Sequence, residues 1–135
     1  TYVWQLEFMH LRYLNTDLEI ESENDLSKIL EEFGEDVVVL HCGEVRGNQH
    51  ASFEIPGNTA GADEAINHFC ALVEGLGNEA RETWERCCSR VMDVGYESGS
   101  SPQTFRSEIR ASTIQRIAAI GASIVITIYS LPDTP

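Results

Sequence analysis

The clearest structural signals in this chain lie in Ala-Ser-Thr-Ile-Gln-Arg-Ile-Ala-Ala-Ile-Gly (residues 111–121) and its continuation Ala-Ser-Ile-Val-Ile-Thr-Ile-Tyr-Ser-Leu (122–131). Ser112 and Gln115 have the spacing of a capping box, in which two side chains satisfy free backbone N–H groups at the start of a helix. Gly121 stands where a left-handed residue would end that helix. The following residues are rich in β-branched side chains, which favour strands. The stretch therefore predicts a helix that leads directly into a strand.

This final strand is apolar on both faces. Alternation places one set of side chains on one face and a second set on the other: Ile124, Ile126 and Ile128, and Val125, Thr127 and Tyr129. A strand of this kind needs cover on both sides. We therefore expect it in the centre of a sheet or at an oligomer interface.

Upstream, the periodicity of apolar residues and the turn residues predict five more strands and three more helices. We expect a turn at Asn15-Thr16-Asp17 and a helix that is capped by Ser22 or Asn24 and stopped by Gly34. Together with residues 111–131, the order is β-α-β-β-α-α-β-β-α-β, whose first five elements resemble a ferredoxin-like start. The other predicted strands are 2–14, 36–42, 49–55, 90–96 and 105–109, and the other predicted helices are 62–76 and 79–89.

These elements predict one α+β domain over residues 1–135. Its length is that of a typical single domain. We expect a single mixed, mainly antiparallel sheet of about five to six strands, with about four helices packed on it.

The chain is strongly acidic, with 22 Asp and Glu against 9 Lys and Arg and a formal net charge of −13. Such a charge repels phosphate, so we expect neither nucleic acid nor an anionic membrane as a partner. Acidity can serve solubility alone, or it can form a surface for a basic protein partner. The candidate partner-binding residues come from the acid-rich segment 17–36: Glu19, Glu21, Glu23, Glu31, Glu32 and Glu35.

The four cysteines form no C-x-x-C pair and no zinc-ribbon spacing. Together with the lack of an apolar run long enough to cross a bilayer, this predicts a protein of the reducing cytoplasm. Cys42, Cys87 and Cys88 are conceivable nucleophiles, but structural thiols are the favoured interpretation.

No common nucleotide-binding, zinc-protease or hydrolase motif is present, so we predict no catalytic residue and no cofactor. His41 and His50 would lie opposite each other on a hairpin if Cys42 paired with Gln49, and Glu54 could then add a third metal ligand. A shift of one residue would separate the two imidazoles. Two surface histidines of this kind more often bind nothing, and we predict no metal site.

Asp93 lies in the middle of a predicted strand. If buried, it would be an acid/base candidate with a raised pKa. An ion pair with Arg106 or Arg110 is the favoured alternative. Should the protein bind a small ligand between its helices and its sheet, the candidate residues are Asp93, Tyr96 and His41.

Residues 84–129 resemble an uncharacterised bacterial family known as domain of unknown function 4279. The resemblance rests on Trp84, Val-Met-Asp-Val-Gly-Tyr (91–96), Phe105, Ile-Ala-Ala-Ile-Gly (117–121) and Ile-Thr-Ile-Tyr (126–129). It implies an α+β fold of this size and brings no activity, cofactor or catalytic residue. The compact, acidic, motif-free chain is also similar to the orphan products of integron gene cassettes.

Three functional hypotheses follow. The first is a non-enzymatic binding or adaptor protein, bacterial and homo-oligomeric, with an exposed edge strand or apolar face as the contact. The second is a small-ligand-binding protein or enzyme with a pocket between helices and sheet. The third is an acidic mimic or immunity-type inhibitor of a basic partner.

Overall fold

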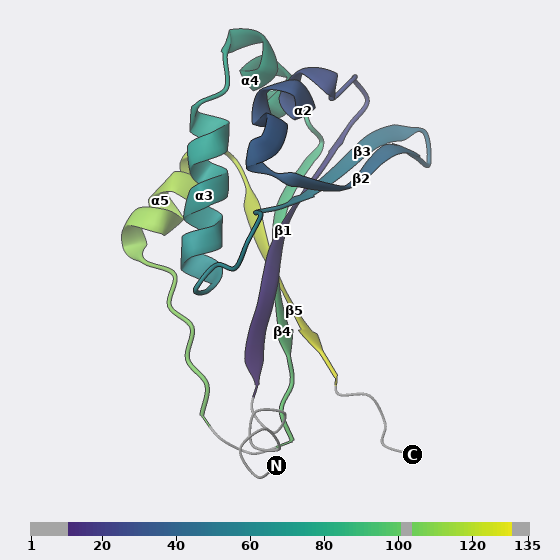
Figure 1. The fold of residues 1–135 in the computed structure, drawn as a ribbon. Coiled ribbons are helices and arrows are strands. Elements are labelled where there is room, and N and C mark those ends of the chain that lie inside the picture. The colour runs from purple at the N-terminus through teal and green to yellow at the C-terminus, as the bar shows by residue number, and fades with distance from the viewer. Residues whose placement is uncertain (1–10, 101–103, 131–135) are drawn as a thin grey trace.

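The computed structural model describes residues 11–100 and 104–130, which form one sheet with helices packed on it (Figure 1). The predicted fold class is confirmed, with five strands and four helices in this part of the chain. The elements are β1 (Arg12–Ser22), α2 (Ser27–Phe33), a 3-10 turn (Gly34–Asp36), β2 (Val38–Val45), β3 (Asn48–Glu54), α3 (Ala62–Glu74), α4 (Asn78–Glu85), β4 (Ser89–Glu97), α5 (Ala111–Ala119) and β5 (Ser123–Tyr129).

The sheet has the strand order β2-β3-β1-β4-β5. β1 runs antiparallel to both β3 and β4, β2 and β3 form an antiparallel hairpin, and β5 joins β4 in parallel. β3 therefore lies between the parallel strands β1 and β2, and β1 lies between the parallel strands β3 and β4. Each is a split β-α-β unit, the arrangement suggested by the ferredoxin-like order of the first elements.

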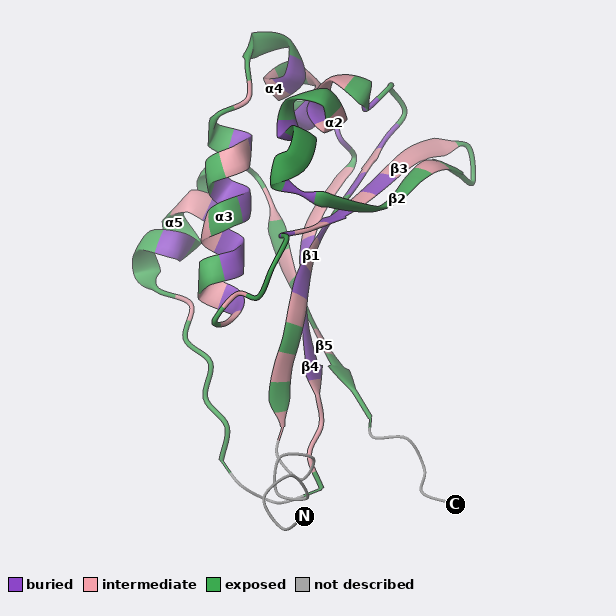
Figure 2. Ribbon diagram, in the orientation of Figure 1, coloured by how far each residue is buried: buried purple, intermediate pink, exposed green. Residues whose placement is uncertain are grey.

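The helices lie on one side of the sheet, and the core fills the space between (Figures 1 and 2). Leu18 and Ile20 of β1 and Met92 and Val94 of β4 point into this core. The helices contribute their apolar stripes, such as Ile66, Phe69, Cys70 and Val73 of α3. Since side chains alternate along a strand, the residues between the buried ones face away from the helices.

The first described strand does not follow the predicted boundaries. Residues 2–10 of the predicted strand 2–14 lie outside the described residues. The predicted turn at residues 15–17 is wrong, because β1 continues through it to Ser22. The pairing with β4 shifts between Tyr13 and Asn15, which marks a β-bulge at Leu14. The bulge puts Tyr13 and Thr16 on the same side of the sheet, where their hydroxyl groups are 2.8 Å apart.

The predicted α5–β5 unit is present, but its capping box is wrong. α5 begins one residue after Arg110, and neither Ser112 nor Gln115 makes a capping bond to another described residue. The predicted helix stop is confirmed: Gly121 has φ of 71°. Its N–H bonds to the carbonyl of Ala118, and the N–H of Ala122 bonds to that of Ile117. These two bonds form a Schellman motif, which satisfies the last carbonyls of the helix.

Three further expectations are corrected. The predicted strand 105–109 is absent, since Thr104–Arg110 has no regular secondary structure. α4 ends at Glu85 and does not reach residue 89. Of the two expected positions of β5, the centre of the sheet is wrong, because β5 lies at an edge of the described sheet; a position at an oligomer interface stays a prediction. In the described residues, no helix is both long and apolar enough to cross a membrane.

Candidate binding surface

The face of the sheet that points away from the helices carries a group of carboxylates from three adjacent strands. Asp17 of β1 is paired directly with Glu54 of β3 on one side and with Asp93 of β4 on the other. Glu19 and Glu21 follow Asp17 at alternate positions of β1 and share its face. We call these five residues, Asp17, Glu19, Glu21, Glu54 and Asp93, the acidic sheet face.

Like charges directly opposite each other destabilise a sheet. The effect is clearest at Asp17, whose pKa is raised from 3.8 to about 6 by burial and then by the charges of Glu54, Glu19 and Asp93. The pKa of Glu19 is also raised, by burial and by Asp93, although His50 opposes this shift. The centre of the acidic sheet face therefore holds negative charge at a cost in free energy.

The negative charge of Glu21, near the end of β1, is better compensated by neighbouring side chains. Its carboxylate accepts a hydrogen bond from the side-chain amide of Asn48 at 3.0 Å and lies 3.1 Å from His50 Nε2. The Asn48 hydrogen bond is the main reason that the pKa of Glu21 is lowered. The negative charge on this side chain is therefore stabilised, unlike that on Asp17.

Two of the other carboxylates, Asp17 and Asp93, accept hydrogen bonds from neutral side chains. Asn15 donates to Asp17 at 3.3 Å, and the Thr127 hydroxyl donates to Asp93 at 2.7 Å. Among the residues that the structure describes, Asp17, Glu19, Glu54 and Asp93 form no ion pair with Lys or Arg. No cationic side chain of Lys or Arg in the described part of the chain therefore neutralises these four carboxylates.

The fold divides the six predicted partner-binding residues. Glu19 and Glu21 lie on the acidic sheet face, and Glu23 is exposed just after β1. The remaining three lie on α2 or the turn that follows it: Glu31, Glu32 and Glu35. Glu32 has a local role, because its carboxylate accepts the backbone N–H of Gly77 at 2.8 Å. Asp17 and Glu54 also belong to the acidic sheet face, and neither was among the predicted partner-binding residues. Glu54 was considered only as a third metal ligand beside His41 and His50.

The predicted ligand-binding residues do not come together. Asp93 and His41 share the open face of the sheet, but β1 and β3 separate their strands, a distance of roughly 14 Å at the usual strand spacing. Tyr96 lies on the other face, where its hydroxyl donates to the Ser107 hydroxyl at 2.8 Å. These three residues therefore form no common pocket.

The favoured ion pair of Asp93 is also not found within the described part of the chain. Thr127 is its hydrogen-bond partner. Arg110 instead pairs with Asp63 of α3, at 2.9 Å between Nε and Oδ2, and the Arg106 side chain is exposed.

The register of the β2–β3 hairpin places both histidines on one face but not opposite each other. Cys42 pairs with Ala51, so His41 stands opposite Ser52 and His50 opposite Gly43. In the described ranges, no three His, Cys, Asp or Glu side chains are grouped so that they could hold a metal ion.

The candidate cysteine nucleophiles are scattered. Cys87 is buried, and burial raises the pKa of its thiol to about 11, as it does for Cys70. A thiol of this kind is protonated at neutral pH and a poor nucleophile. Cys42 and Cys88 are exposed, on β2 and just before β4.

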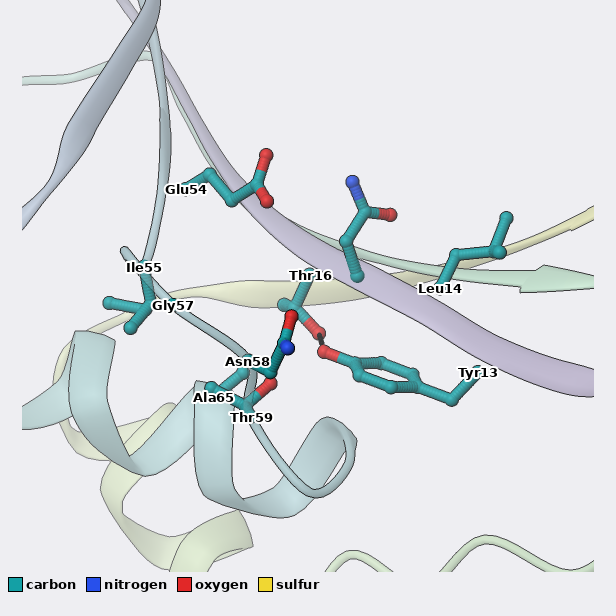
Figure 3. A pocket seen from close by; sticks show the side chains of 10 residues that line it. Tyr13, Leu14, Thr16, Glu54, Ile55, Gly57, Asn58, Thr59 and Ala65 are labelled. Atoms are coloured by element: carbon teal, nitrogen blue, oxygen red, sulfur yellow. Dashed lines mark hydrogen bonds between the residues drawn. The ribbon is translucent and has the colours of Figure 1, made fainter.

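Two of the hollows in the described structure lie beside the central and last strands of the sheet. A polar one of about 70 Å³ is lined by Tyr13, Thr16, Glu54 and Asn58 (Figure 3). It is large enough for one or a few water molecules only. A larger, mostly apolar one of about 490 Å³ is lined by residues that include Tyr96, Phe105, Ile126 and Ile128. It lies at the edge of the sheet, beside β5.

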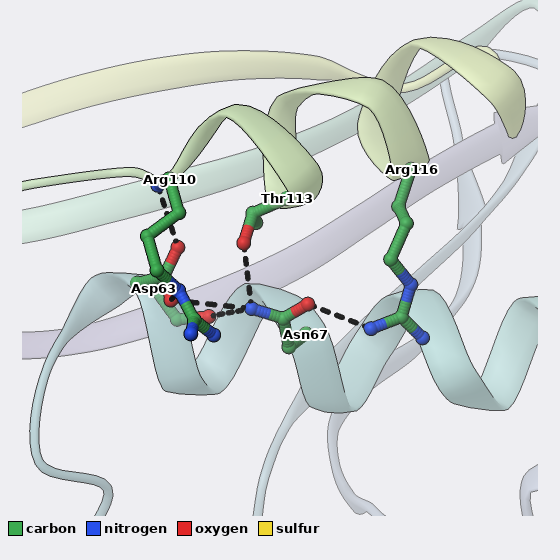
Figure 4. A network of polar contacts seen from close by, with 5 residues as sticks. All are labelled: Asp63, Asn67, Arg110, Thr113 and Arg116. Carbon is green, nitrogen blue, oxygen red and sulfur yellow. Dashed lines mark hydrogen bonds and ion pairs between the residues drawn. The ribbon is translucent and has the colours of Figure 1, made fainter.

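A polar network joins α3 to α5 (Figure 4). Asn67 of α3 donates to the Thr113 hydroxyl at 2.8 Å and accepts from Arg116 at 2.6 Å. Arg116 also makes a bidentate pair with Glu74, at 2.7 and 2.9 Å. These side chains have partners within the fold, so the network fixes the two helices relative to each other. A hollow of about 370 Å³, lined in part by Asp63, Asn67 and Arg110, lies beside it.

Comparisons of the chain with protein-family models, with curated proteins and with solved structures find no match. The functional inference therefore rests on the geometry of the described residues.

Proposed function

We propose that this chain is a non-enzymatic binding protein whose acidic sheet face docks a basic segment of a protein partner. The observation that carries the proposal is the pairing of Asp17 with both Glu54 and Asp93 across three strands. A bound Lys or Arg would neutralise this charge where no described side chain does so.

The shape of the surface favours a polypeptide over a small molecule. The carboxylates lie on the face of a sheet, with neighbouring strands about 4.8 Å apart. Glu54 also lines the polar hollow of about 70 Å³, which has room for a few water molecules only. Successive Arg or Lys side chains of an extended or helical segment can each meet a different carboxylate. Charge complementarity of this kind contributes to association rate and specificity as well as affinity.

The expected cellular location and bacterial origin are also part of the proposal. The four unpaired cysteines support a reducing, cytoplasmic location. The resemblance of residues 84–129 to the uncharacterised bacterial family suggests a bacterial origin and adds no activity.

A synthetic peptide of alternating Arg and Ser provides the test, with affinity measured by calorimetry at low and at high salt. The sheet-face variant combines Asp17→Asn, Glu54→Gln and Asp93→Asn. A control variant combines Glu31→Gln, Glu35→Gln and Asp36→Asn, which remove as many charges from exposed positions on and after α2.

We expect the natural chain to bind the peptide and to lose affinity steeply with salt, as exposed charges are screened. The sheet-face variant should bind at least about tenfold more weakly, while the control variant stays within about twofold. Equal losses in the two variants would show that net charge, and not this face, attracts the peptide. Absence of binding at low salt would contradict the proposal outright.

A further inference from the structure

The edge strand β5 is unusually exposed for so apolar a segment. Its side chains Val125, Ile126, Ile128 and Tyr129 are between 42% and 64% exposed. Val125 and Tyr129 project from one face of the sheet, and Ile126 and Ile128 from the other. Within the described residues, β4 is its only strand partner.

Edge strands are normally protected against pairing with other chains by charged residues, proline or a bulge. β5 has none of these: Ser-Ile-Val-Ile-Thr-Ile-Tyr contains no Lys, Arg, Asp, Glu or Pro, and its pairing with β4 is unbroken. The opposite edge, β2, is protected, because its pairing shifts between Val39 and His41 and it includes Glu44. β5 is therefore the edge of the sheet that is more favourable for pairing with a strand of another chain.

We propose that β5 pairs antiparallel with β5 of a second copy of this chain, about a two-fold axis at Ile126. The sequence of β5 is self-complementary about this position. Ile126 would face Ile126 of the second copy, and Ile124 would face its Ile128. Val125 would likewise face Thr127 of the second copy. Three isoleucines from each chain then form one continuous apolar row on the helix side of a joined sheet.

Two observations favour a second copy over another protein as the occupant. First, β5 is self-complementary about Ile126, and it contains no Asp or Glu that would add repulsion between two copies of a chain with a net charge of −13. Second, Ile126 and Ile128 line an apolar hollow of about 490 Å³ on the same face of the sheet that the isoleucines of the second copy would occupy. The pairing would thus cover both the edge of the sheet and the two isoleucines that line this hollow.

The inference stands on β5 and does not depend on the acidic sheet face. A two-fold axis perpendicular to the sheet would nevertheless leave both acidic faces on the same side of the joined sheet. The dimer could then present two such faces to one partner.

Sedimentation velocity over a range of concentrations, from about 1 µM to about 1 mM, tests for the dimer. Ile126→Glu places two carboxylates at the axis, and Val39→Glu makes the same kind of change on the β2 edge, at a side chain that is also exposed. Circular dichroism of both variants checks that each is folded. We expect a monomer–dimer equilibrium that Ile126→Glu weakens at least about tenfold and Val39→Glu leaves nearly unchanged.

Disulfide trapping tests the register in a Cys42→Ser, Cys88→Ser background, because those two thiols are exposed. Ile126→Cys should crosslink to its own copy under mild oxidation. Ile128→Cys should not, since four residues of offset put the two positions roughly 13 Å apart along the strands, beyond disulfide reach. A monomer throughout the range, an equal effect of the two glutamates, or equal crosslinking at both positions would each overturn the inference.

Discussion

The carboxylate of Asp63 accepts the backbone N–H of Arg110 at 3.0 Å, although the two residues lie 47 positions apart. Arg110 precedes the first residue of α5, so a side chain from α3 binds at the start of another helix. The same carboxylate receives the Arg110 guanidinium at 2.9 Å. A long-range contact thus supports the helix start that the sequence assigned to the local capping box of Ser112 and Gln115.

Asp63→Ala should remove this support. We expect a loss of about 1–2 kcal/mol in the free energy of unfolding, the usual effect of deleting a helix cap. Urea titration followed by circular dichroism measures it. Glu108→Ala, an exposed position just before α5, is the control and should change stability by less than about 0.5 kcal/mol. Equal effects would contradict a capping role for Asp63.

Arg90→Lys should destabilise the junction of α4, β4 and α5. The Arg90 guanidinium donates to the carbonyls of Trp84, Glu85 and Cys87 at 3.0–3.1 Å, and its Nε donates to that of Gly121 at 2.9 Å. The lysine amine cannot reproduce this fork. We expect a loss of about 2 kcal/mol, since hydrogen bonds from charged groups are the stronger ones.

Arg86→Lys provides the matched control for that prediction. Among the described residues, the exposed Arg86 side chain forms an ion pair only with Glu82, one helical turn earlier and also exposed. Such surface pairs contribute little, so its unfolding midpoint in urea should stay close to that of the natural chain. If the two lysine variants had the same unfolding midpoint in urea, the hydrogen bonds from the Arg90 guanidinium to the surrounding carbonyls would contribute no more to stability than a lysine does.

Gly121→Ala should cost about 1–2 kcal/mol, because φ of 71° is unfavourable for residues with a Cβ. The added methyl would also lie 3.1 Å from Arg90 Nη2. Gly43→Ala is the control: a Cβ there meets nothing closer than His41 at 3.9 Å. Thermal unfolding compares the two, and a Gly121→Ala protein as stable as Gly43→Ala would contradict the prediction.

The acidic sheet face predicts an unusual dependence of stability on pH. The pKa of Asp17 is about 6 in the folded protein and 3.8 when unperturbed, so the folded state binds the proton more tightly. Stability should therefore increase as pH falls from about 7 toward about 5, the opposite of an ion-paired carboxylate. Urea midpoints across this window measure the slope.

Asp17→Asn removes the titrating group and should flatten that slope. The variant should also be more stable than the natural chain at pH 7 and above, where the charged carboxylate is costly. Asp36→Asn, in the exposed 3-10 turn, should leave the slope in place. A slope that persists in Asp17→Asn would mean that another group is responsible.

Elements defined by local signals were predictable from the sequence. The stripe Ile66, Phe69, Cys70 and Val73 predicted α3, and all four side chains are buried. Gly34 and Gly121 were expected at helix ends, and both have positive φ. Each of these signals is contained within about two turns of helix, so no knowledge of distant partners is needed.

Elements defined by distant partners were not predictable. Asn15-Thr16-Asp17 has turn residues, but pairing of β1 with β3 and β4 holds the segment extended. Conversely, apolar or small and charged residues alternate over 105–109 as in a strand, but this segment pairs with no strand of the described sheet. Alternation indicates an extended backbone, whereas a strand also requires a neighbour.

The acidic sheet face could not be predicted from the sequence for the same reason. It depends on the register that brings Asp17 beside Glu54 and Asp93, residues far away in the chain. One local signal did exist: Asp17, Glu19 and Glu21 alternate with Leu18 and Ile20, the pattern of a strand with one buried face. The expected turn obscured that pattern.

The central position of β1 has a consequence for synthesis on the ribosome. Its two neighbours lie at residues 48–54 and 89–97, so β1 emerges long before either can pair with it. An unpaired, half-apolar strand is an aggregation hazard during this interval. The carboxylates at alternate positions are the kind of charged gatekeeper that keeps such strands apart. The same charges that crowd the finished sheet can thus protect the nascent chain.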